Sequence, residues 1–114
     1  MESILTSVKK LLGIEAEDTS FDVDIIIHIN SALMVLNQLG AGPVAGLSIK
    51  DASTTWAEFL PENSNNLDAV KSYVFLKVKM LFDPPLSSAA MNAMNKLIDE
   101  FEWRINVAAE TRVT

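Results

Sequence analysis

The feature that most constrains the fold is a pair of apolar segments separated by Asp83-Pro84-Pro85. The first segment, residues 67–82, carries apolar side chains at helical spacing on nearly every side. A helix this apolar must be covered by protein on several faces. Pro84 disfavours helical geometry at Asp83, and neither proline can donate a backbone hydrogen bond, so the helix must end there.

Residues 87–110 are predicted to form a second helix that folds back on the first. Ser87 or Ser88 caps its start, because a serine hydroxyl accepts a hydrogen bond from a free amide of the first turn. One face carries apolar residues at spacings of three and four, namely Ala90, Met94, Leu97, Phe101, Ile105 and Ala108. This face is predicted to pack against residues 67–82 and to complete a helical hairpin.

The N-terminal part of the chain also shows helical periodicity, and no strand alternation longer than a few residues occurs. The predicted helices span residues 4–12, residues 21–39 after a cap at Thr19 or Ser20, and residues 51–60 after a capping box at Ser48–Asp51. The second of them has a main apolar stripe of Ile25, Ile29, Ala32, Leu33 and Leu36. We expect an all-α protein, a small bundle of about five helices with a long C-terminal helical hairpin, forming a single domain over residues 1–114.

Residues suited to catalysis or metal binding are scarce. The chain has no cysteine and one histidine, His28, which could pair with Asp24 but lies in no metal-binding motif. Asp99, Glu100 and Glu102 are close in sequence, and their helical positions predict a solvated face. We therefore predict no catalytic, cofactor or metal site and no enzymatic activity; a small enzyme of unfamiliar type would need a pocket of converging polar groups.

The charge balance disfavours free binding to nucleic acid, because 15 acidic residues against 9 basic ones give a net charge of −6. Lys71, Lys77 and Lys79 form one short basic cluster, which we interpret as two solvated lysines and one that extends from an apolar face. A helical regulatory or nucleic-acid-binding protein is the alternative function, and it would have to use this cluster. No membrane span and no signal peptide are predicted.

Two helices have more apolar surface than a chain of 114 residues can readily bury. Trp103 and Val107 lie opposite the apolar stripe of residues 87–110, and Val23, Ile27 and Met34 form a second strip on residues 21–39. We predict that these five residues form protein interfaces, with packing of Trp103 on the domain's own first helix as the alternative. Asn30 and Asn37 share a face of the same helix, where they either face solvent or form hydrogen bonds within a protein interface.

The chain resembles the phage head-tail connector proteins, also called adaptor proteins. The resemblance runs from about residue 4 to residue 110. It rests on FDVDIIIHINSALMVLNQLG, GPVAGLSIKD, TTWAEFL and YVFLKVKMLFDPPLSSAAMNAMNKLIDEFEWRINVAAE in this order. The most specific pieces are LFDPP and the helix that ends in EWRINVAAE. No catalytic motif is part of it.

This resemblance implies a structural virion protein of a phage or prophage, without a cofactor. Such subunits assemble in the host bacterial cytoplasm into a homo-oligomeric ring at the head-tail junction, below the portal protein. The ring extends the DNA channel, lets DNA pass without sequence-specific binding, and gives tail or head-completion proteins a docking surface. An acidic subunit suits such a channel, since like charges repel the DNA backbone.

Overall fold

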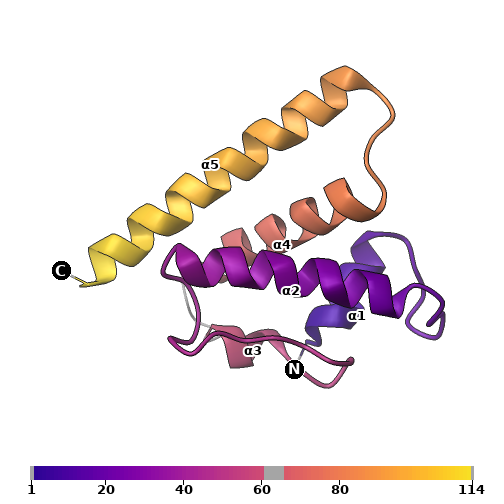
Figure 1. The fold of residues 1–114 in the computed structure, drawn as a ribbon, viewed down its shortest axis with the longest axis horizontal. Coiled ribbons are helices and arrows are strands. Elements are labelled where there is room, and N and C mark those ends of the chain that lie inside the picture. The colour runs from indigo at the N-terminus through magenta and orange to yellow at the C-terminus, as the bar shows by residue number, and fades with distance from the viewer. Residues whose placement is uncertain (1, 61–65, 114) are drawn as a thin grey trace.

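The computed structural model describes residues 2–60 and 66–113, and within these ranges the chain forms five α-helices and no strand longer than an isolated bridge between Ser3 and Thr55. The helices are α1 (Ile4–Leu11), α2 (Asp22–Gln38), α3 (Trp56–Phe59), α4 (Leu67–Phe82) and α5 (Ser88–Val113) (Figure 1). The all-α prediction is confirmed. The predicted polar loop after α3 falls mostly on residues 61–65, which lie outside the described ranges.

The core is built on α2 and α4, which run antiparallel. The ring of Phe21, just before α2, meets the ring of Phe82, at the end of α4, edge to face with 5.4 Å between centroids. Between these ends, the predicted α2 stripe and the inner face of α4 are buried together, as Ile25, Ile29, Ala32, Leu33, Leu36, Val70, Tyr73, Val74 and Val78. Leu81, which continues the helical spacing of Val70, Val74 and Val78 along α4, is exposed.

Helix α1 packs on both α2 and α4 and ends before Gly13, whose φ of +83° suits glycine best. Lys9 is its unexpected residue, because its side chain is only 3% exposed. The ammonium group lies 2.8 Å from the Asp22 carboxylate and donates a hydrogen bond to the Ala16 carbonyl at 3.1 Å. Lys9 therefore links α1 both to the loop at Ala16 and to the start of α2. Neither Thr19 nor Ser20 caps α2 with its side chain, so that prediction is wrong.

Helix α3 is shorter than predicted and begins five residues later. Its capping box joins Thr55 and Glu58, not Ser48 and Asp51. Trp56, Phe59 and Leu60 are buried, and Ala52, which lies before the observed start of α3, is exposed. The Trp56 indole N–H donates to the Ser7 hydroxyl at 2.8 Å, which holds α3 against α1.

Asn30 and Asn37 hold the loop between α2 and α3 against α2. They are therefore neither solvent-facing groups nor interface groups, which were the two predicted roles. The Asn30 amide donates to the Ile49 carbonyl at 3.0 Å and accepts from the Ile49 N–H at 2.7 Å. The Asn37 amide donates to the Pro43 carbonyl at 2.8 Å. These bonds replace the strand or helix partners that the loop backbone lacks.

Helix α5 packs on the bundle mainly through its C-terminal half (Figure 1). Ser87 caps it, as predicted, by accepting a hydrogen bond from the Ala90 N–H. The predicted stripe is partly wrong. Ile105 is buried as predicted, but Ala90 and Leu97 are exposed, and Ile98, which lay outside the predicted stripe, is buried. The first turns of α5 diverge from α4, so only the later turns meet the core.

Candidate protein interface

The outer face of α2 carries three large apolar side chains that no other part of the described chain covers. Val23, Ile27 and Met34, here called the α2 ridge, are between 56% and 72% exposed. They lie on the side of the helix opposite the buried stripe, as the hundred-degree step of a helix requires. The prediction that these side chains are surplus to the core is confirmed, and their role in an interface stays a prediction.

The outer face of α5 carries Trp103 and Val107, here called the α5 ridge. Trp103 is 67% exposed, so the alternative in which it packs inside its own domain is wrong. Val107 is exposed to a smaller degree. Tryptophan is a favoured anchor at protein contacts.

A third apolar surface, which the sequence did not predict, is a groove floored by α4 and flanked by α1 and α5. It measures about 390 Å³ and is lined mainly by Leu11, Lys71, Phe75, Leu76, Leu97 and Phe101. Periodicity assigned Leu97 to the core, yet both Leu97 and Leu11 are exposed. The groove forms because α5 diverges from α4 and leaves this part of the α4 surface open.

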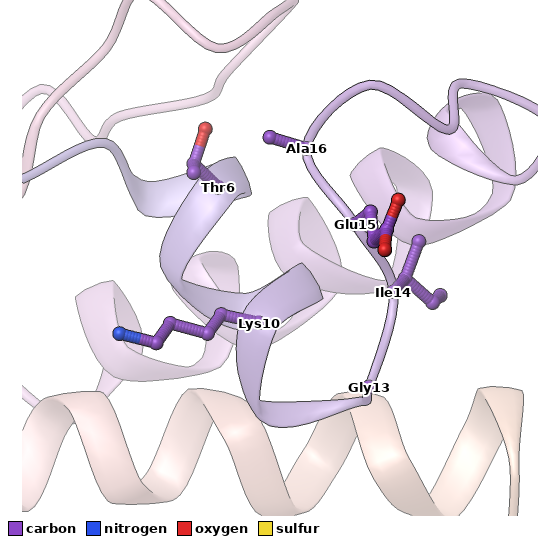
Figure 2. Close-up of a pocket in the computed structure, with 6 residues that line it drawn as sticks. All are labelled: Thr6, Lys10, Gly13, Ile14, Glu15 and Ala16. Atoms are coloured by element: carbon purple, nitrogen blue, oxygen red, sulfur yellow. The ribbon is translucent and has the colours of Figure 1, made fainter.

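Charged side chains lie beside the groove on the side of α1. A second hollow, which shares Leu11 and Lys71 with the groove, is also lined by Lys10, Trp56 and Glu2. Lys71 is held by the Glu2 carboxylate at 2.8 Å and lies 5.9 Å above the Trp56 ring. Figure 2 shows Lys10 extending from α1 away from Glu15, with Thr6 and residues 13–16 around a shallow surface hollow. No hydrogen bond or ion pair within the described residues engages the Lys10 ammonium group.

The basic cluster proposed for the alternative function is largely neutralised. Lys71 pairs with Glu2, and Lys79 pairs with Asp83 at 2.8 Å. Arg104 adds nothing to this cluster, since it pairs with Glu100 on α5. The geometry therefore gives no support to a nucleic-acid surface on α4.

The ionisable side chains that could take part in catalysis instead hold helices together. The Tyr73 hydroxyl donates to the Glu102 carboxylate at 2.7 Å, so the prediction that Glu102 faces solvent alone is wrong. Burial of Tyr73, reinforced by this hydrogen bond and by the negative charge of Glu102, raises the pKa of the Tyr73 phenol well above its usual range. No bond joins His28 to Asp24 in the part of the chain that the structure describes.

A search of the described ranges finds no group of three or more histidine, cysteine, aspartate or glutamate side chains placed to hold a metal ion. Nor does any helix in those ranges have the length and apolar character needed to cross a membrane. What the described surface offers is apolar area on α2, on α5 and in the groove.

Comparison with known proteins gives one family. A family model described as "Phage connector protein" matches residues 4–112, which is nearly the whole chain. No curated protein and no solved structure matches the chain.

Proposed function

The chain belongs to the phage connector protein family, and from this premise we propose that it joins head to tail as one subunit of a ring below the portal protein. Membership gives it a structural connector role in a phage. The proposal adds that the ring is homo-oligomeric, that it extends the DNA channel, and that tail or head-completion proteins dock on it. Residues 1–114 act in it as a single helical connector domain.

The observation that carries this proposal is the exposed apolar surface on two helices of one small chain. Val23, Ile27 and Met34 on α2, and Trp103 and Val107 on α5, lie on different elements and point outward. A subunit in a ring has two neighbours and, in a connector, further partners above and below. Several separate apolar surfaces therefore suit a ring subunit better than a monomer.

The charge of the chain fits a channel through which DNA passes. The net charge of −6 disfavours tight contact with the phosphate backbone, and the lysine cluster on α4 is mostly paired with acids. DNA would therefore slide past the ring without sequence-specific contacts. The site of action is the head-tail junction of the virion, after assembly in the host cytoplasm.

Co-sedimentation with the cognate portal protein tests the proposal. The chain should sediment with purified portal oligomers in a fixed ratio, and an excess of a Trp103→Ala, Val23→Ala, Ile27→Ala variant should fail to displace it. A chain that stays in the supernatant at every portal concentration, while circular dichroism shows that it is folded, would count against a connector role at the portal.

A further inference from the structure

We propose that the α2 ridge of one subunit docks into the groove between α1, α4 and α5 of the next copy of this chain. The contact is head to tail, so one copy contributes Val23, Ile27 and Met34 and its neighbour contributes the groove. This inference rests on the proposed ring, and it names the two surfaces that build it.

The ridge and the groove lie on opposite faces of the molecule. Helix α4 lies behind α2 in Figure 1, and the buried residues Val70, Val74 and Val78 belong to the core that the two helices share. Ser72 and Leu76 line the groove and, by the hundred-degree step, lie nearly opposite Val74 on α4. The α2 ridge faces outward from the other side of the same pair of helices. The molecule measures 43 × 36 × 21 Å, so these are the two faces of a flat body.

Charge selects the α2 ridge as the occupant of the groove. Lys10 lines the hollow that adjoins the groove at Leu11 and Lys71, and its ammonium group has no partner among the described residues, whereas Lys71 is paired with Glu2. The α2 ridge carries exposed Asp24 next to Val23, and no ion pair engages Asp24 within the described residues. A docked ridge would therefore bring an unpaired acid to an unpaired base, while its apolar side chains meet Leu11, Phe75 and Leu97.

The α5 ridge fits the groove less well. Trp103 and Val107 are accompanied on the outer face of α5 by Lys96 and Asp99, which carry opposite charges, and by the internal pair of Glu100 and Arg104. This face offers no net charge to match Lys10. The α5 ridge is thereby left for a different partner, such as the portal or a tail-side protein.

Two different surfaces on opposite faces define a heterologous contact, and repetition of such a contact closes a ring when its rotation permits. An isologous contact, in which two α2 ridges meet across a twofold axis, would stop at a dimer. It would also leave Asp24 without a base, because α2 contains no lysine or arginine. The groove on the opposite face removes that conflict.

Two serines allow the contact to be tested with little disturbance of the fold, because the native chain has no cysteine. Ser31 is exposed one turn after Ile27, and Ser72 is exposed at the groove. Ser31→Cys and Ser72→Cys are made as separate variants and treated with a short bis-maleimide, alone and mixed, under conditions of assembly. We expect a covalent dimer in the mixture and none in either variant alone.

Light scattering on the same samples separates this inference from the proposed function. Assembled particles without a mixed cross-link, or with a cross-link in either variant alone, would overturn the docking of ridge in groove and leave the ring in place. A chain that never assembles would overturn both.

Charge reversal gives an independent check. Lys10→Glu and Asp24→Lys should each raise the protein concentration needed for assembly several-fold, and the double variant should restore the native value. If the double variant needs a still higher protein concentration for assembly than either single variant, the pairing of Lys10 with Asp24 is contradicted.

Discussion

The Tyr73 hydroxyl of α4 donates a 2.7 Å hydrogen bond to the Glu102 carboxylate of α5, from a ring that has no exposed surface. With the packing of Ile98 and Ile105, this bond fixes the part of α5 from Ile98 onward on the bundle. The turns before Ile98 have no buried residue and diverge from α4. The groove is thus a consequence of where α5 is attached and where it is not.

Tyr73 should make the protein sensitive to alkali. Burial raises the folded-state pKa of this phenol above its unfolded value of about 10, so the unfolded chain loses its proton first. The stability contributed by the neutral phenol is complete below about pH 10 and declines as the pH rises beyond that value. Tyr73→Phe should lower the free energy of unfolding by about 1 kcal/mol at neutral pH.

Melting temperatures measured from pH 8 upward, for the native chain and Tyr73→Phe, check this prediction. Tyr73 is the only tyrosine, so tyrosinate absorbance reports this residue alone. The two melting curves should converge as the pH rises. A difference in melting temperature that stays constant with pH would contradict the burial of this phenol. So would a tyrosinate that forms at its ordinary pH in the folded protein.

Gly42 should be far less replaceable than Gly13, although both have a φ of +83°. A Cβ at position 42 would lie 2.5 Å from the Phe59 ring, whereas one at position 13 would meet nothing within 4 Å. Gly13→Ala therefore measures the cost of the left-handed backbone alone, about 1–2 kcal/mol. Gly42→Ala should add about 1–3 kcal/mol for overpacking. Urea denaturation gives both values, and equal losses would mean that the Phe59 ring moves aside freely.

Lys9 and Lys10 should separate stability from assembly. Lys9→Met leaves Asp22 without its partner and should lower the free energy of unfolding by about 1–3 kcal/mol, with assembly unchanged in conditions where the variant is folded. Lys10→Met should leave stability within about 0.5 kcal/mol of the native value and weaken assembly. Thermal unfolding and light scattering on both variants check the pair. A reversed pattern would place Lys10 in the fold and Lys9 at a contact.

Trp103→Ala should change the melting temperature little, because the side chain is mostly exposed, and should weaken attachment to the portal or a tail-side partner. Ile105→Ala is the matched core variant, since Ile105 lies two positions further on and is 1% exposed. It should lower the free energy of unfolding by about 2–5 kcal/mol. Thermal unfolding with co-sedimentation on portal measures both effects. Similar destabilisation by the two variants would assign Trp103 to the core.

Periodicity predicted the central helices well because their burial follows from spacing alone. The stripe from Ile25 to Leu36 is buried as expected, and the prolines after Asp83 end α4. Periodicity also predicted that Val23, Ile27, Met34 and Trp103 are left out of the core, since each lies on the side of its helix opposite an apolar stripe.

The remaining errors concern contacts between distant segments. Spacing cannot tell that Asn30 bonds to Ile49, nor that Lys9 is buried against Asp22. It placed Leu97 rather than Ile98 inside, because the divergence of α5 depends on tertiary packing. One missed signal was local: Thr55-Trp-Ala-Glu58 has the spacing of a capping box and marks the true start of α3. The groove could not be predicted, since it depends on the angle between α4 and α5.

The central claim is assembly, and native mass spectrometry of the purified chain, alone and with its portal, tests it most directly. The subunit has a mass of 12.5 kDa. We predict a single discrete multiple of this mass, present either in the free protein at high concentration or on the portal, and lost in a variant that combines Lys10→Glu with Val23→Ala and Ile27→Ala. A species that remains at 12.5 kDa at every concentration and in the presence of portal would contradict the account.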